Sequence, residues 1–210
     1  MTGTTGTILF VRHGATAATR QARFAGMTDS SLSAEGRQQA AGLAAAVAGF
    51  APQVCYTSPL LRCRQTASLL SAAGHPPVEL LAGLQEMDFG SWEGKTYREI
   101  ARADQAGLDR MLRFDRGYAP GGGSEKLGGF MSRVRQTLRT ITAEPAERAL
   151  VVTHGGVIRA ALCVLLDLNP RRHFHSFEIA PAGMAEILVF DGGAVLRRLS
   201  PTLKEQEVLQ

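Results

Sequence analysis

The feature that most constrains the fold is a pair of short apolar runs, each followed closely by a histidine and a glycine. Residues 7–11 (TILFV) and 149–153 (ALVVT) carry mainly nonpolar side chains on both alternating faces. A strand that is apolar on both faces suits the centre of a parallel sheet covered by helices on each side. We therefore expect two central strands, which end at Arg12-His13-Gly14 and at His154-Gly155-Gly156.

Helical patterns alternate with further short strands along the chain. A helix capped by Ser33 is predicted to run to about Gly49, and a second helix is predicted from Ser58-Pro59 to Gly74. The other predicted elements are a loop over 17–32, strands at 53–57, 78–81, 186–190 and 194–199, and helices at 96–114, 130–142 and 157–168. This alternation predicts an α/β fold, a three-layer α/β/α sandwich with a central, mostly parallel sheet, in a single domain over residues 1–210 with a core at about 7–200.

Composition narrows the class of protein. The net charge of +4 comes without a Lys/Arg-rich run interleaved with aromatic residues, so nucleic acid is not an expected partner. The absence of a long apolar run and of an apolar core near the N-terminus predicts no membrane span and no signal peptide. Cys55, Cys63 and Cys163 lack metal-ligand spacing and are predicted to be buried in a reducing compartment, which favours a cytoplasmic location.

Charged and imidazole side chains follow the predicted strand ends. Arg12 and His13 follow the first strand, Arg62 lies in the first helical turn after the second, Glu86 lies near the third and His154 follows the fourth. Carboxyl ends of parallel strands meet at one edge of the sheet, where α/β folds bind ligands. Guanidinium groups and the N-terminus of a helix both bind phosphate oxygens, so the sequence predicts an anion site. One carboxylate is too few for a divalent metal, and neither a metal nor a cofactor is expected.

These residue types suit phosphoryl transfer through histidine. A neutral imidazole at His13 can attack phosphorus and form a phosphohistidine. Arg12, Arg62 and a protonated His154 would stabilise the charge on the transferred group. Glu86 would protonate the leaving oxygen and then accept a proton from water, although Asp88 and Glu93 lie close enough in sequence to be alternative acids.

Five motifs in the same order resemble those of the histidine phosphatase (phosphoglycerate-mutase-like) superfamily. They are LFVRHGAT at 9–16, FAGMTDSSLS at 24–33, TSPLLRCRQTA at 57–67, LQEMDFGSWEG at 84–94 and VVTHGG at 151–156. Together the matches extend from about residue 8 to residue 190. One RHG triplet alone is a weak signal, whereas five ordered motifs are specific.

The resemblance implies a role for each matching position. His13 corresponds to the phosphorylated histidine, Glu86 to the proton donor, and Arg12, Arg62, His154 and the Gly155 amide to the phosphate pocket, with Ala25 and Gly26 near the rest of the substrate. Three positions depart from the family pattern. Thr19 replaces a phosphate-contacting Asn, Ala15 replaces a common Glu, and Gly123-Ser124 replaces a Gly-Glu-Ser pattern with Glu125 displaced by one.

Several functions stay open at this point. The chain lacks the extended insertion of phosphoglycerate mutases and has Gly156-Val157-Ile158 in place of their His-Gly-Asn type second motif, which favours a phosphatase. Segments 86–94 and 174–187 look most similar to α-ribazole-5′-phosphate phosphatases, while broad-specificity sugar-phosphate and phosphoserine phosphatases share much of the pattern. In each case a small phosphorylated metabolite is the expected partner. A catalytically silent binding module would lack a catalytic residue, and none of the five is missing.

Four further cationic residues are weaker candidates for the pocket, and one edge strand is a candidate dimer surface. Arg20 and Arg23 could rim the pocket or could equally be solvated, and His173 and His175 could also rim it, although their position favours a helix-to-strand connector. The edge strand expected near the C-terminus offers a surface for a homodimer.

Overall fold

A six-stranded sheet forms the centre of the computed structural model, which describes residues 4–71, 76–143 and 146–200. Its order is β3-β2-β4-β1-β5-β6. The first four strands in that order run parallel, and β5 and β6 continue the sheet antiparallel. The strands are β1 (Thr4–Arg12), β2 (Val54–Thr57), β3 (Val78–Leu80), β4 (Arg148–Thr153), β5 (Met184–Phe190) and β6 (Gly193–Ser200). The mostly parallel sheet predicted from the sequence is confirmed.

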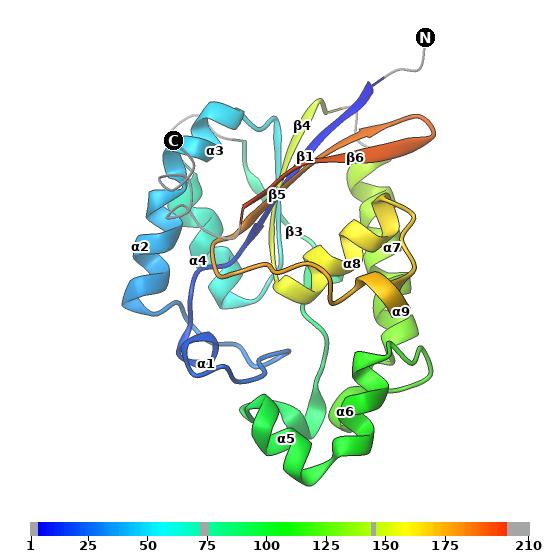
Figure 1. The fold of residues 1–210 in the computed structure, drawn as a ribbon. Helices are drawn as coiled ribbons and strands as arrows, with labels where there is room; N and C mark the ends of the chain where they lie inside the picture. Colours follow the sequence, from blue (N-terminus) through cyan, green and yellow to red (C-terminus); the bar gives the residue numbers. More distant parts are fainter. Residues whose placement is uncertain (1–3, 72–75, 144–145, 201–210) are drawn as a thin grey trace, which may run out of the picture.

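Helices cover both faces of the sheet (Figure 1). One layer holds α2 (Ala34–Gly42), α3 (Ala44–Phe50) and α4 (Leu61–Leu70). The other holds α7 (Leu127–Ala143), α8 (Gly155–Leu165) and α9 (Pro170–His173). Beyond the sheet, at the bottom of Figure 1, lie α5 (Tyr97–Ala103) and α6 (Gln105–Leu112). Three short 3-10 helices are η1 (Ala82–Leu84), η2 (Gly90–Trp92) and η3 (Pro120–Gly122).

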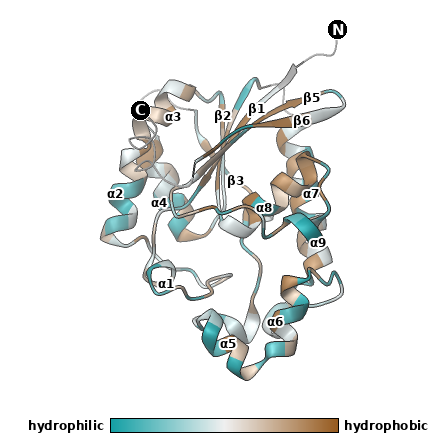
Figure 2. Cartoon of the chain, viewed as in Figure 1, coloured by the Kyte–Doolittle hydropathy of each residue, from teal (hydrophilic) through white to brown (hydrophobic). Residues whose placement is uncertain are grey.

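Successive side chains of β1 point to opposite faces of the sheet and so pack against both helical layers. Leu9 and Val11 pack in the cluster that includes α3 and α4, and Ile8 and Phe10 pack in the cluster that includes α7 and α8. All four side chains are buried, as a strand apolar on both faces requires. Figure 2 shows the central strands predominantly in the colours of hydrophobic residues, whereas α2 and α5 carry hydrophilic stretches. The predicted three-layer sandwich is confirmed.

The helix expected to start at Ser58-Pro59 starts three residues later. It begins at Leu61, because Leu60 keeps an extended backbone and makes no side-chain cap. The Ser58 hydroxyl lies 2.9 Å from Nε2 of His154. Arg62 still falls in the first turn, as predicted. The helix ends at Leu70, and the predicted end at Gly74 lies outside the described residues.

Two predicted helices are each divided into two. The helix after Ser33, whose hydroxyl accepts from Gly36 N–H at 3.0 Å as predicted, breaks at Leu43 into α2 and α3. The helix over 96–114 breaks at Asp104, whose carboxylate accepts from Gly107 N–H and so starts α6. An Asp side chain that bonds the backbone competes with a continuous helix. The predicted loop at 17–32 also contains one helical turn, α1 (Ala17–Arg20).

Three further expectations concern the cysteines, the membrane and the sheet edge. Cys55, Cys63 and Cys163 are buried and unpaired, as predicted. Within the described ranges, none of the helices has the length and hydrophobicity to cross a membrane. The C-terminal strand β6 is an edge strand, as expected, and a homodimer through it stays a prediction.

Candidate active site

The strand ends bring the predicted side chains to one edge of the sheet. β1 ends at Arg12, and His13 follows it directly. β4 runs parallel beside β1 and ends at Thr153, so His154 lies next in line and caps α8. The His13 N–H donates to Thr153 O at 2.9 Å, which ties the two strand ends together. The two imidazole rings lie 5.2 Å apart between centroids, at an angle of 67°.

His13 is held as a neutral imidazole with one free nitrogen. Its Nδ1 lies 2.8 Å from the carbonyl oxygen of Gly14, which can only accept, so Nδ1 carries the proton and Nε2 keeps its lone pair. Burial, reinforced by the nearby charges of Arg12 and Arg62, holds the His13 pKa well below its usual value. A buried imidazole with a free Nε2 is suited to nucleophilic attack.

His154 is fully buried behind the same edge. Besides Ser58, its ring contacts Cys63, whose sulfur lies 3.4 Å from Nε2. Burial and then the neighbouring His13, followed by the two arginines, lower the His154 pKa well below its usual value. The low pKa favours the neutral ring in the free chain, and the protonated form expected during phosphoryl transfer stays a prediction. A bound phosphate dianion would reverse this, because an adjacent opposite charge favours the imidazolium.

Arg62 is fully buried and Arg12 half-buried near His13, and the buried Nε of each is an unused donor. Arg12 donates through one terminal nitrogen to Ile179 O, and burial lowers its pKa to about 10. Arg62 donates to Thr28 O at 2.7 Å and to Gly26 O at 2.8 Å. Among the described residues, three buried side-chain nitrogen or oxygen atoms have no hydrogen-bond partner, and two of them are Nε of Arg12 and Nε of Arg62.

Glu86 lies against the first turn of α8. Its Oε2 accepts from Gly156 N–H at 2.9 Å and its Oε1 accepts from Met87 N–H at 3.1 Å. Glu86 lines the same cavity as His13. A carboxyl group that faces the nucleophile across a cavity is placed to exchange a proton with a substrate oxygen.

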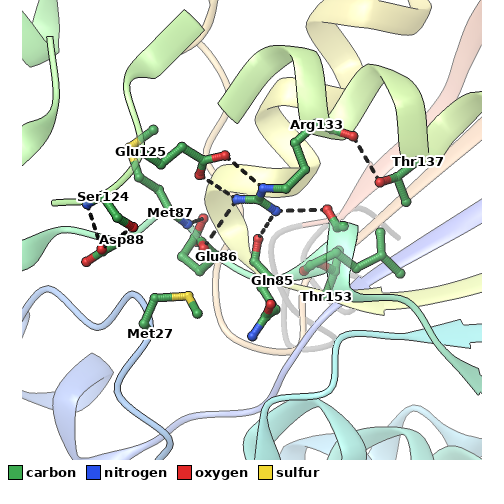
Figure 3. A network of polar contacts seen from close by, with 12 residues as sticks. Met27, Gln85, Glu86, Met87, Asp88, Ser124, Glu125, Arg133, Thr137 and Thr153 are labelled. Carbon is green, nitrogen blue, oxygen red and sulfur yellow. Dashed lines mark hydrogen bonds and ion pairs between the residues drawn. The ribbon is translucent and has the colours of Figure 1, made fainter. Parts of the chain in front are cut away.

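Arg133 fixes the segment that carries Glu86 (Figure 3). From α7, its guanidinium donates to Gly83 O at 2.9 Å and to Gln85 O at 2.7 Å, and reaches Glu86 O at 3.4 Å. Its Nε and one terminal nitrogen also donate to the two carboxylate oxygens of Glu125, at 2.8 and 2.7 Å. The displaced Glu125 noted in the sequence is therefore a partner of Arg133.

The two alternative acids are used elsewhere. Asp88 accepts from Ser124 N–H and Oγ–H at 2.8 and 2.7 Å, and these bonds with the Gly90 N–H hold its pKa below the usual range (Figure 3). Glu93 accepts from the N–H groups of Met27 and Thr28 and from the Thr28 hydroxyl. Neither carboxylate lines the cavity, which favours Glu86 as the acid.

A cavity of about 420 Å³ opens from His13. Of the predicted site residues, it is lined by Arg12, His13, Thr19, Ala25, Glu86 and Gly155. Arg62, His154 and Gly26 are buried and are not among the lining residues. The hydroxyl of Thr19 donates to Thr16 O at 3.1 Å, so it would have to give up this bond to donate to a phosphate.

The cavity also has lining residues that sequence reasoning missed. Arg159 and Phe174 were not singled out, and Arg159 lies four residues after Gly155, on the same face of α8. That spacing was a usable signal for Arg159. His175 and Arg23 line the cavity, whereas Arg20 and His173 do not. Arg23 is paired with Glu99 and Arg20 with Glu35.

Comparison with known families agrees with this arrangement. Residues 8–202 match the model of the histidine phosphatase superfamily, branch 1. The chain belongs to the histidine phosphatase superfamily. This confirms the resemblance drawn from the five motifs.

Two curated proteins illustrate the similarity of this chain to known sequences. A bifunctional protein of Mycobacterium tuberculosis is 34% identical over 208 residues, which are 95% of this chain and 55% of that protein. The chain thus spans about half the length of the first curated relatives that it matches. A glucosyl-3-phosphoglycerate phosphatase of Mycolicibacterium vanbaalenii is 31% identical over 77% of this chain and 74% of its own.

Solved structures of the superfamily share the fold. Phosphoserine phosphatase of Entamoeba histolytica, in complex with 3-phosphoglyceric acid, superposes with a TM-score of 0.83 at 26% identity, over 94% of this chain and 98% of that one. The α-ribazole phosphatase of Shigella flexneri gives a TM-score of 0.81 at 25% identity, over 92% and 96%.

Proposed function

We propose that this chain hydrolyses small phosphate monoesters through a phosphohistidine on His13. The observation that carries the proposal is the pair of buried Nε donors, on Arg12 and Arg62, left without a hydrogen-bond partner beside a neutral imidazole. An unsatisfied buried donor costs about 1–3 kcal/mol, more when it is charged. Phosphate oxygens would satisfy both donors and offset that cost.

The first step transfers the phosphoryl group to the protein. Nε2 of His13 attacks phosphorus, a P–N bond forms and the bond from phosphorus to the leaving oxygen breaks. Glu86, entering protonated, gives its proton to that oxygen. The two arginines and the Gly155 N–H at the start of α8 bind the equatorial oxygens, where the charge of the transition state is spread.

The second step returns the enzyme to its starting state. A water molecule attacks phosphorus and passes a proton to the Glu86 carboxylate, and the P–N bond breaks to release phosphate and free Nε2. His154 takes a proton only while the dianion is bound, because its burial favours the neutral ring otherwise. No step requires a metal, and we propose that none takes part.

The substrate is proposed at the level of its class. α-Ribazole phosphate, phosphoserine and glucosyl-3-phosphoglycerate follow from the names of similar proteins, and sugar phosphates belong to the same class of small monoester. We further propose a single domain over residues 1–210 and, from the three buried free cysteines, a cytoplasmic location.

A phosphate-release screen over these esters and phosphoglycerates tests the function. With a chelator present, we expect wild-type turnover of at least one ester and loss of turnover in His13→Ala, with His173→Ala as the matched control outside the cavity. Quenching with denaturant at alkaline pH is expected to trap a phosphoprotein that is stable in base and is lost when the sample is acidified. Full activity in His13→Ala, or loss of wild-type turnover in the chelator, would refute the mechanism.

A further inference from the structure

The cavity extends well past the residues that would hold a phosphate. Its volume of about 420 Å³ lies within the range of roughly 300–1,000 Å³ that encloses drug-sized ligands. Away from His13, the wall is formed largely by apolar and aromatic side chains: Phe24, Phe89, Tyr97, Met111, Phe130 and Phe174. A phosphate with a small polar leaving group would leave most of this wall without a partner.

The aromatic part of the wall is built in advance. Phe24 packs edge-to-face on Phe89, with centroids 5.0 Å apart at 85°, and lies nearly parallel to Tyr97 at 6.4 Å and 27°. On the opposite side, Phe130 and Phe114 both pack on Phe174. Rings held in place by other rings offer flat surfaces at little entropic cost, which favours a flat, largely apolar leaving group.

Arg159 is a cation within this apolar wall. It lies one helical turn beyond Gly155, the residue that packs against the Arg12 guanidinium, so it faces the cavity about 6 Å further along α8. Its Nε donates to Phe177 O at 2.8 Å, which fixes the direction of the guanidinium. Among the described carboxylates, none lies within ion-pair distance of Arg159, although Glu86 and Glu178 attract it from further away.

A half-buried guanidinium is costly unless an anion pairs with it. Burial lowers the Arg159 pKa from its ordinary value, which is the sign of that cost. The planar fork binds a carboxylate through two parallel hydrogen bonds. A singly charged carboxylate suits this place better than a second phosphate, because the negative charge of Glu178 lies nearby.

We propose that the preferred substrate is a phosphate monoester whose leaving group is flat and largely apolar and carries a carboxylate, which Arg159 binds. The proposal rests on the phosphatase function proposed above and assigns the specificity of that same site. Phosphate is held by Arg12 and Arg62, the ring by the aromatic wall and the carboxylate by Arg159.

Synthetic aryl phosphates test the carboxylate directly. The series is 3- and 4-carboxyphenyl phosphate, their methyl esters as neutral partners of matched shape, and glycerol 3-phosphate as a small substrate. For wild type, we expect kcat/KM of at least one carboxylate to exceed that of its own methyl ester by about ten-fold or more, which is the ordinary size of one charge-assisted hydrogen bond. This comparison needs no variant.

Substitutions then assign the effect to residues. Arg159→Gln is expected to remove the preference for the carboxylate while changing kcat/KM of the methyl ester less than about two-fold, and Arg172→Gln, an exposed arginine on α9, is the matched control. Tyr97→Ala, at a side chain that is 44% exposed and so dispensable for folding, is expected to raise KM for every aryl phosphate and to leave glycerol 3-phosphate unchanged.

The outcomes separate the two proposals. Absence of turnover for every ester, in wild type as in His13→Ala, would contradict the phosphatase function itself. Hydrolysis of all the esters with equal kcat/KM for carboxylates and methyl esters would overturn the specificity inference alone. The specificity inference would also be overturned if Arg159→Gln lowered kcat/KM by the same factor for the carboxylates and for their methyl esters.

Discussion

At the scale of single residues, Gly156 determines how closely Glu86 can approach helix α8. A Cβ at this position would lie 2.4 Å from Oε1 of Glu86, well inside contact distance. Gly156→Ala is therefore expected to push the carboxyl group away from the leaving oxygen. General acid catalysis contributes about 10²–10⁴ in rate, so we expect kcat for alkyl phosphates to fall by about 100-fold.

Leaving-group dependence identifies the cause of that loss. A nitrophenolate leaves without needing a proton, so Gly156→Ala should reduce kcat for nitrophenyl phosphate far less than for an alkyl phosphate. Steady-state kinetics on both esters measures the difference. Gly129→Ala, in α7 where the added Cβ meets only Glu125 at 3.7 Å, serves as the control. An equal loss on both esters would show that Gly156 does not act through Glu86.

The sequence was sufficient to place several active-site residues, because the end of a strand can be recognised from a few neighbouring residues. Arg12, His13 and His154 each adjoin an apolar run, and β1 and β4 pair in parallel, so their ends meet. What Thr19 and Glu125 bond to could not be predicted, because it depends on side-chain geometry three to eight residues away. Arg159 lies four residues after Gly155, which was a usable signal, but nothing in the sequence indicated that a cavity runs along that face of α8.

At the scale of elements, Arg133 joins helix α7 to the segment that carries Glu86. Arg133→Met would leave the carbonyls of Gly83 and Gln85 and the carboxylate of Glu125 without their donor. Unsatisfied groups of this kind cost about 1–3 kcal/mol each, so we expect a lower free energy of unfolding, measured by urea denaturation. We also expect the activity to fall more steeply for alkyl than for nitrophenyl phosphates, because Glu86 loses its support.

Two comparison variants show whether Arg133 and Glu125 act together in supporting the segment that carries Glu86. Arg135→Met changes an exposed arginine two residues along the same helix and should alter neither property. The double variant Arg133→Met/Glu125→Gln should be less destabilised than the sum of the single variants, since they remove one shared ion pair. Strict additivity would mean that Glu125 does not hold Arg133 in place.

Element boundaries were the least predictable part of the fold, for a physical reason. Ser58-Pro59 has the composition of a helix start, yet the Ser58 hydroxyl lies against His154, 96 residues away. Leu60 accordingly stays extended and α4 begins only at Leu61. A local signal was overridden by a long-range bond at the active site. Conversely, Ser33 has no competing partner among the catalytic residues and caps its helix as predicted.

At the scale of the whole molecule, the two buried histidines link folding to pH. Both have pKa values held below that of an unfolded chain, so below about pH 6.5 the unfolded state binds protons that the folded state does not. The free energy of unfolding should therefore fall as the pH decreases through that range, by about 1.4 kcal/mol per pH unit for each histidine. Above that pH range, the contribution of both histidines to the free energy of unfolding is fully present.

Inorganic phosphate should oppose this loss, because it binds only the folded site and favours the protonated ring of His154. Urea denaturation between about pH 5.5 and 7, with and without phosphate, measures both effects. At one hundred times its dissociation constant, phosphate should add about 2.7 kcal/mol to the free energy of unfolding. The double variant His13→Asn/His154→Asn should show a shallower pH slope and less stabilisation by phosphate. If the variant keeps the wild-type slope, other groups control the acid stability and the electrostatic account of the two histidines is wrong.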